Sequence, residues 1–134
     1  MRMNEDDLLS EVLRKAAGLG WATFHARPAR TEAGWRTPGS GTLAKGFPDL
    51  VAFHPEHGIL VAELKSEKGR MRPEQVEARH AIEAAMTAVA RAGATLYDPT
   101  HQGPAHVLRR LRYRIWRPID LDDGTIEREL RGAK

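Results

Sequence analysis

The chain has 134 residues, of which 41% are hydrophobic, so it can build one domain with a modest core, and we expect residues 1–134 to form a single domain. It contains no cysteine and no run of about 18 apolar residues, which argues against disulfide frameworks, thiolate metal sites and membrane spans and predicts a soluble protein of the cytoplasm. The formal net charge of +3 favours a polyanionic partner only mildly.

The N-terminal segment is predicted to form a helix. Asn4 is a candidate N-cap, and apolar residues recur at helical spacing from Leu8 to Leu19. Glu5 falls on the same side of this helix as Leu8 and Val12, so we expect it on the buried face. A contribution to capping the helix start explains Glu5 equally well.

A short strand is predicted for residues 21–26, followed by a long segment rich in glycine and proline, residues 28–45, that is expected to lack regular structure. Loops of this length are usually functional or disordered in a small domain. Trp35 within this loop could stack on an exposed base or could simply anchor the loop.

Basic residues gather in two clusters. The first basic cluster is Arg27, Arg30, Arg36 and Lys45, and the second is Arg109, Arg110, Arg112, Arg114 and Arg117. Solvated surface explains either cluster alone. Phosphate binding becomes the better explanation if both clusters lie beside one acidic site, because carboxylates alone would repel nucleic acid.

Two apolar runs, residues 50–54 and 59–64, are separated by a turn-rich tetrapeptide and predict an antiparallel hairpin. Side chains alternate along a strand, so Glu63 and Lys65 share one face of the second run. A charged pair in an apolar strand is costly to bury unless its members pair or bind something. The pair therefore indicates either a salt bridge at a strand end or a functional site.

Asp49 begins the first strand of this hairpin and comes close to Glu63 and Lys65. A plain four-residue loop would set Asp49 opposite Leu64, whereas an odd-numbered loop or a bulge would set it opposite Glu63. Two converging carboxylates repel unless a cation lies between them, so the pattern predicts a Mg²⁺ or Mn²⁺ site at Asp49 and Glu63, with Glu5 as an additional candidate ligand. Such an ion polarises a phosphodiester and activates water, while Lys65 orients the water or neutralises charge, and the predicted reaction is phosphodiester hydrolysis.

The remaining chain is predicted to contain both helices and strands. The expected elements are a polar loop over 67–73, a helix from Pro73 to about Ala92 that Gly93 ends, a strand over 94–97, one or two helical turns within 106–112, a short edge-like strand over 113–116 and a helix over 122–130. His54 and His57 flank the hairpin turn and are not expected to bind zinc without further ligands. His25 could approach the site, although a structural role is more common.

The string Lys-Gly-Phe-Pro-Asp-Leu at 45–50, followed by Glu-Leu-Lys at 63–65, Gly69 and Gln75, resembles the VRR-NUC branch of the PD-(D/E)XK nucleases. Gly20-Trp21, His25 and Trp116-Arg117-Pro118 are also similar to that branch, in particular to its compact stand-alone phage members, so the resemblance covers most of the chain. It implies an α/β fold with a restriction-endonuclease-like core, a mixed β-sheet flanked by α-helices.

The resemblance also implies roles for individual residues. Asp49 and Glu63 would be the metal ligands and Lys65 the catalytic lysine. Gln75, at the start of the following helix, would face the site as a fourth catalytic residue, although by itself it would be ordinary helix surface. The candidate DNA-contacting cations are Arg27, Arg30, Arg36, Lys45, Lys68 and Arg70.

The function implied by the resemblance is a metal-dependent DNA nuclease that selects branched or junction DNA. Stand-alone members are similar to Holliday-junction resolvases, which suggests a homodimer that presents two sites, and a phage-encoded chain would act in the cytoplasm of the host cell. The long segments 28–45 and 97–113 depart from the family pattern and could reshape substrate choice.

Two other functions compete with this one. A non-catalytic DNA-binding accessory module on the same fold would gain nothing from converging carboxylates. A sequence-specific restriction-type enzyme would usually need a larger recognition apparatus than these two segments offer. The sequence leaves open the preferred DNA structure, endonuclease or exonuclease action, cut polarity and the number of metal ions.

Overall fold

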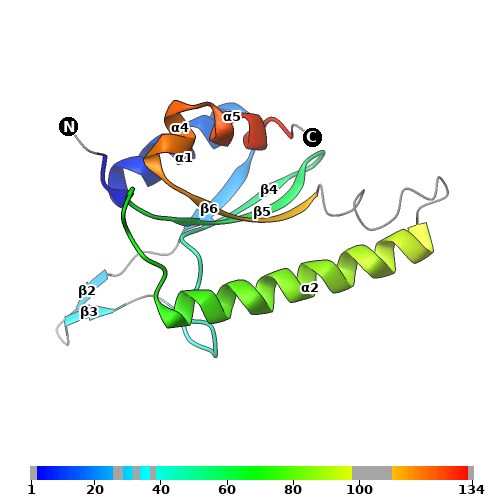
Figure 1. The fold of residues 1–134 in the computed structure, drawn as a ribbon, viewed down its shortest axis with the longest axis horizontal. Helices are drawn as coiled ribbons and strands as arrows, with labels where there is room; N and C mark the ends of the chain where they lie inside the picture. The colour runs from blue at the N-terminus through cyan, green and yellow to red at the C-terminus, as the bar shows by residue number, and fades with distance from the viewer. Residues whose placement is uncertain (1–2, 26–28, 32–33, 37–38, 98–109, 133–134) are drawn as a thin grey trace.

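The computed structural model describes residues 3–25, 29–31, 34–36, 39–97 and 110–132, and it is a mixed α/β structure in which helices cover both faces of a four-stranded sheet (Figure 1). The elements in chain order are α1 (Glu5–Gly18), β1 (Ala22–His25), β2 (Ala29–Thr31), β3 (Gly34–Arg36), β4 (Leu50–His54), β5 (Gly58–Leu64), α2 (Pro73–Tyr97), β6 (Leu111–Trp116), α4 (Pro118–Asp122) and α5 (Thr125–Leu130). In the described residues, no helix is long and apolar enough to cross a membrane.

Helix α1 begins as the sequence predicts. The Asn4 side chain accepts a hydrogen bond from the Asp7 backbone at 2.8 Å, and the Asp7 carboxylate accepts one from the Asn4 backbone at 3.3 Å, which forms a capping box. The expectation that Glu5 is buried is wrong, because the buried stripe starts one turn later, at Leu8. The exposed acidic first turn instead favours the positive end of the helix dipole.

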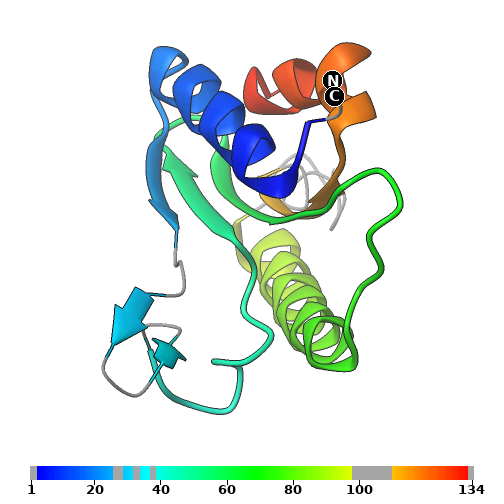
Figure 2. The ribbon, with the colours of Figure 1, turned by 90° about the vertical axis from the view of Figure 1, so that its left-hand side faces the viewer.

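The main core lies between one face of the sheet and helices α1, α4 and α5, which are stacked on that face in Figure 2. Leu60 and Leu64 of β5 point into it and meet Leu8 of α1 and Ile126 of α5, all at most 1% exposed. Each such side chain contributes roughly 1.5–3 kcal/mol through the removal of apolar surface from water. Trp21 links the segment after α1 to the end of α5, since its indole nitrogen donates a hydrogen bond to the Leu130 carbonyl at 2.8 Å.

The hairpin of β4 and β5 resolves the register that the sequence left open. Leu50 pairs with Ala62 and His54 pairs with Gly58, so the connection is the three-residue loop 55–57, an odd-numbered loop. Gly58 adopts φ +82°, the left-handed conformation that closes such loops. Continuing the register by one residue sets Asp49 opposite Glu63, on the same face of the sheet.

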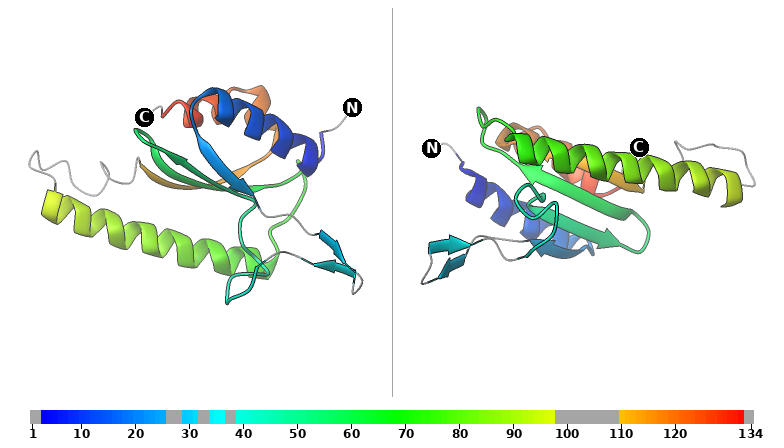
Figure 3. Two further views of the ribbon diagram at one scale, coloured as in Figure 1. Left: turned by 180° about the vertical axis from the view of Figure 1, so that it is seen from behind. Right: turned by 90° about the horizontal axis from the view of Figure 1, so that it is seen from below.

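After β5, the chain crosses over through α2 and returns as β6, which pairs with β5 in parallel and forms the edge of the sheet order β1-β4-β5-β6. Helix α2 covers the opposite face from α1 and runs past the end of the sheet (Figure 3). The predicted stop at Gly93 and the predicted strand over 94–97 are wrong, because α2 continues to Tyr97. One glycine costs a helix only about 1 kcal/mol, which the rest of a long helix offsets.

Three further expectations need correction. Leu111 and Arg112 belong to β6 rather than to helical turns, and residues 98–109 lie outside the described residues. The predicted helix over 122–130 is divided into α4 and α5 at Gly124, whose φ is +82°. The segment 28–45 was expected to lack regular structure, yet β2 and β3 form a small antiparallel hairpin that stands apart from the main sheet (Figure 2).

Candidate active site

The structure brings Asp49 and Glu63 together at the end of the sheet where β4 begins and β5 ends. The Asp49 carboxylate accepts a hydrogen bond from the Leu64 backbone nitrogen at 2.8 Å, which fixes it beside β5. Glu63 is only 1% exposed, whereas Asp49 is partly exposed. One carboxylate therefore lies inside the protein and the other forms its boundary with solvent.

Glu63 is in an environment that disfavours its charge. Burial is the main cause that raises the pKa of Glu63 to about 9, and the neighbouring Asp49 adds to the rise through a hydrogen bond and through its charge. Lys65 lowers the pKa of Glu63, and the charge of Glu5 raises it slightly. In the absence of a cation, Glu63 is consequently protonated at neutral pH.

The two oxygens of Glu63 have different partners. Gln75 donates from Nε2 to Glu63 Oε1 at 3.1 Å, whereas Oε2 has no hydrogen-bond donor among the described residues. A proton shared between Glu63 and Asp49 satisfies Oε2 when Glu63 is neutral, and a cation satisfies it when both carboxyls are ionised. Hard divalent ions such as Mg²⁺ and Mn²⁺ prefer oxygen ligands, so this donor pair fits them.

Gln75 lies on the first turn of α2 and is 6% exposed, so it is not ordinary helix surface. Its Oε1 accepts from the Arg72 backbone nitrogen at 2.9 Å, and this contact directs Nε2 toward Glu63. The segment before Asp49 packs against the same turn, since a Cβ on Gly46 would lie 2.0 Å from the Glu74 carbonyl oxygen. Only glycine fits at position 46. Gly46 is part of the string at 45–50, but the sequence alone does not show the contact that requires glycine there.

Lys65 directly follows β5 and is 6% exposed. Its backbone nitrogen donates to the Trp116 carbonyl at 2.9 Å, which extends the β5–β6 pairing by one residue. Its side-chain stem passes close to Gly69, where an added Cβ would lie 3.5 Å from Lys65 Cδ. The buried amine is therefore held on the carboxylate side of the chain, where its charge acts on Glu63.

Glu5 stays a predicted additional ligand that no contact in the structure tests. It is exposed at the start of α1, and its charge is the last of the causes that raise the pKa of Glu63. Within the described ranges, no group of three or more His, Cys, Asp or Glu side chains is placed to hold a metal ion. The ligands that the structure brings together are thus Asp49 and Glu63, and the remaining coordination positions would fall to water and substrate oxygens.

The first basic cluster is described only in part. Lys45 is exposed and lies four residues before Asp49. Lys68 and Arg70 are exposed in the loop that follows Lys65. Arg27 lies outside the described residues, and Arg30 and Arg36 lie in β2 and β3, where only the backbone is described. The exposed cations described close in sequence to the carboxylate pair are thus Lys45 of the first basic cluster and, outside that cluster, Lys68 and Arg70.

The described members of the second basic cluster make contacts within the protein. Arg112 and Arg114 both pair with the carboxylate of Glu129, at 2.9 and 2.6 Å. Arg117 donates from Nη1 to the carbonyls of Ser66 and Gly69 at 2.6 and 2.8 Å. These arginines anchor α5 and the loop after Lys65, and Arg109 lies outside the described residues.

The histidines beside the hairpin turn have structural partners. The rings of His54 and His57 stack at 4.3 Å between centroids, and Trp21 packs on His54 at 5.1 Å. His54 Nε2 lies 3.1 Å from the Leu19 carbonyl oxygen, while its Nδ1 accepts from the backbone. Burial is the main cause that lowers the pKa of His57, which fits a neutral stacked ring.

Tyr113 was not singled out by its place in the sequence. It is 7% exposed on β6, and its hydroxyl has no hydrogen-bond partner in the described part of the chain. Burial first, and then the charge of Glu63, raises the pKa of Tyr113 to about 12. The Arg79 guanidinium lies 5.8 Å from the centre of its ring.

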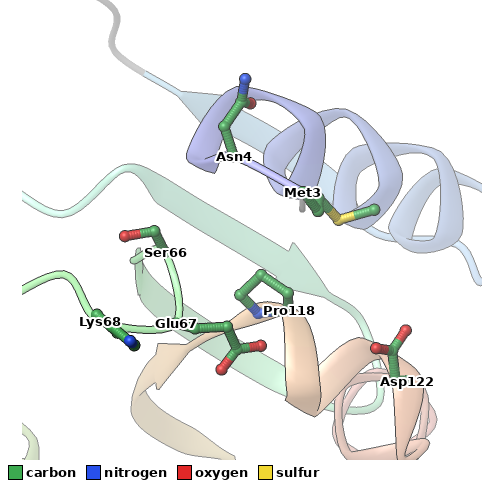
Figure 4. A pocket seen from close by; sticks show the side chains of 7 residues that line it. All are labelled: Met3, Asn4, Ser66, Glu67, Lys68, Pro118 and Asp122. Atoms are coloured by element: carbon green, nitrogen blue, oxygen red, sulfur yellow. The ribbon is translucent and has the colours of Figure 1, made fainter. Parts of the chain in front are cut away.

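A pocket of about 500 Å³ lies between the start of α1, the loop after β5 and helix α4 (Figure 4). Its lining comes from three separate parts of the chain: Met3, Asn4, Ser66, Glu67, Lys68, Pro118 and Asp122. No local sequence pattern links these residues, because only the fold brings the start of α1, the loop after β5 and helix α4 together. The pocket was therefore invisible to sequence reasoning.

Two carboxylates, a buried lysine and an oriented glutamine thus converge at one end of the sheet. This set can hold a divalent cation and place a positive charge beside a substrate oxygen. Comparisons with family models, curated proteins and solved structures find no significant match to this chain.

Proposed function

We propose that this protein is a metal-dependent deoxyribonuclease that hydrolyses phosphodiester bonds with Mg²⁺ or Mn²⁺. The observation that carries the proposal is the pairing of Asp49 with the buried Glu63, whose Oε2 has no hydrogen-bond donor in the part of the chain that the structure describes. Such a pair is costly unless a proton or a cation lies between its members. A salt bridge between Glu63 and Lys65 alone would not require Asp49 at the same place.

Each residue has a distinct role in this proposal. Asp49 and Glu63 hold the ion, and Gln75 keeps Glu63 oriented by occupying its Oε1. The bound ion supplies Lewis acidity toward the phosphate and lowers the pKa of water. Lys65 brings its ammonium group to the negative charge that develops on the phosphate during hydrolysis.

We also propose that the sheet is a restriction-endonuclease-like core and that the chain is a VRR-NUC-type member of the PD-(D/E)XK nucleases. The order α1, β1, β4, β5, α2, β6, with an antiparallel hairpin followed by a parallel return, supports this proposal. The placement of Gln75 against Glu63 supports it as well. Both observations concern arrangement, and fold alone does not decide function.

The proposed substrate is branched or junction DNA. Lys45, Lys68 and Arg70 are exposed close in sequence to Asp49 and Lys65, where they can contact phosphates on either side of the scissile bond. A homodimer with two sites is part of this proposal, as is action in the host cytoplasm for a phage-encoded chain. Neither follows from the carboxylate pair itself.

The test is cleavage of labelled four-way, flap, single-stranded and linear DNA in Mg²⁺ or Mn²⁺. We expect wild type to cut at least one of them, Asp49→Asn and Lys65→Ala to bind without cutting, and Lys15→Ala to behave as wild type. Lys15 is a suitable control because it lies near the far end of α1, in an ion pair with Glu127. Binding of all substrates without cleavage in either metal would instead identify a non-catalytic DNA-binding accessory module.

A further inference from the structure

We propose that the pocket between α1, α4 and the loop after β5 binds one unpaired nucleoside of the DNA strand that is cut at the carboxylate pair. The pocket is lined by Met3, Asn4, Ser66, Lys68 and Asp122, among others, and has a volume of about 500 Å³ (Figure 4). This proposal rests on the proposed nuclease function for the identity of the strand. The lining of the pocket includes neither Asp49 nor Glu63.

The walls of the pocket are fixed by hydrogen bonds from outside it. Arg117 holds the loop through the carbonyls of Ser66 and Gly69, and the Glu67 carboxylate accepts from the Ile119 backbone nitrogen at 2.7 Å. The capping box of Asn4 fixes the start of α1 on the other side. A ligand therefore meets a preformed site and loses less free energy to ordering it.

The lining matches the chemistry of a nucleobase. Met3 and Pro118 offer apolar surface for the face of a ring, and the lining also includes the polar residues Asn4, Ser66 and Asp122. These groups provide both donors and acceptors, which the edge of a base requires. A volume of about 500 Å³ is in the range of small-molecule sites and admits a base with its sugar, but not a stacked duplex.

The charges argue against a phosphate inside the pocket. Two carboxylates, Glu67 and Asp122, lie in its lining and only one cation, Lys68. A phosphate would be repelled by the two acids, whereas a neutral base would not. Lys68 is exposed, so it can contact the phosphate that connects the inserted nucleoside to its neighbour.

The pocket and the carboxylate pair share one stretch of chain. Lys65 directly follows β5, and the next residue, Ser66, lines the pocket. The pocket and the carboxylate pair therefore both lie at the end of β5, where one DNA strand can contact both.

This placement limits the substrate. Extraction of a paired base from a duplex costs a few kcal/mol, whereas an unpaired base enters a pocket at much lower cost. Flaps, gaps and single strands should therefore bind better than a continuous duplex. The specificity would come from one nucleoside rather than from a sequence.

The test compares binding to a continuous duplex and to the same duplex with one unpaired nucleotide, in Ca²⁺ so that binding can be followed without relying on cleavage. The pocket is blocked by Asp122→Phe, a change at an exposed position on α4. Asp122→Asn keeps the space open, and Glu77→Phe makes a change of the same kind on exposed α2 surface. Fluorescence anisotropy of labelled DNA reports the affinity.

We expect wild type, Asp122→Asn and Glu77→Phe to prefer the unpaired nucleotide by roughly tenfold, and Asp122→Phe to lose this preference while it binds continuous duplex as wild type does. Preference that survives in Asp122→Phe would overturn the proposal. A protein that shows the preference but cuts no DNA would overturn the nuclease function and leave the nucleoside pocket supported.

Discussion

Glu63 is the residue whose environment is hardest to explain without a ligand. Its side chain is 1% exposed, one oxygen accepts a hydrogen bond from Gln75, and the other has no donor among the described residues. A protein that needed only a stable strand would place an apolar residue there, as it does at Val61 two positions earlier. Unfavourable charge at a buried position is a common property of functional sites.

The pKa of Glu63 gives a prediction for the metal-free protein. Its folded-state pKa of about 9 lies above the ordinary value of 4.5, so the folded state binds the additional proton and the free energy of unfolding falls as pH rises from about 4.5 to 9. At pH 8 we expect Glu63→Gln to raise the free energy of unfolding by about 1–3 kcal/mol, because the amide stays neutral. Thermal unfolding of both proteins from pH 5 to pH 9 measures the difference.

The same pair of proteins provides its own control. The difference in stability should shrink toward pH 5, where Glu63 is protonated in the folded state and increasingly so in the unfolded chain. Mn²⁺ should stabilise wild type but not Glu63→Gln at pH 8. A destabilising effect of Glu63→Gln at pH 8 in the absence of metal would show that Glu63 is charged and paired within the folded protein.

Among the elements, the hairpin of β4 and β5 decides whether a site exists. The sequence predicts both strands and their pairing, and the structure confirms them. It could not fix the register, because one residue in the loop determines whether Asp49 faces Glu63 or Leu64. Gly58, which follows the loop 55–57, is left-handed and also lies close to Arg110, far along the chain, and this approach has no signal in the local sequence.

Substitution of Gly58 tests this account of the hairpin. A Cβ on Gly58 would lie 2.1 Å from the Arg110 carbonyl oxygen, and φ is +82° there. We expect Gly58→Ala to lower the free energy of unfolding by at least about 2 kcal/mol, since strain and a backbone clash add up. Gly18→Ala in α1 is the matched control, because nothing lies within 4 Å of its added Cβ, and it should be neutral or stabilising by up to about 1 kcal/mol.

Chemical denaturation of the two variants measures both effects. Equal stabilities for Gly58→Ala and wild type would mean that the loop can close without the left-handed residue. The register that pairs Asp49 with Glu63 would then have another cause.

At the scale of the whole molecule, local sequence patterns do not predict contacts between segments that are distant in sequence. Helix α1 follows from apolar periodicity, α2 from Pro73 and an alanine-rich composition, and the hairpin strands from two apolar runs. The resemblance indicated Asp49, Glu63, Lys65 and Gln75, which the structure brings together. The second basic cluster could not be assigned in this way, because Glu129 and the carbonyls that receive Arg117 are distant in sequence. The pocket has no sequence signal for the same reason.

The contrast between an exposed lysine in the loop after β5 and a lysine held in an ion pair gives a prediction for DNA binding. Lys68 is exposed beside the site, whereas Lys15 lies far along α1 in an ion pair. If Lys68 contacts a phosphate, Lys68→Ala should weaken binding and reduce the slope of log affinity against log salt by about 1, while Lys15→Ala should leave the slope unchanged. Binding titrations over a range of NaCl concentrations measure the slopes, and equal slopes for all three proteins would remove Lys68 from the DNA interface.

The most direct test of the central claim is Mn²⁺-dependent DNA cleavage, measured during a titration of the ion into wild type and Glu63→Gln. The account predicts that wild-type cleavage saturates with the ion, that a chelator abolishes it, and that Glu63→Gln lacks cleavage although it is folded. Cleavage by Glu63→Gln at the wild-type rate and with the wild-type dependence on Mn²⁺ would contradict a metal site at Asp49 and Glu63.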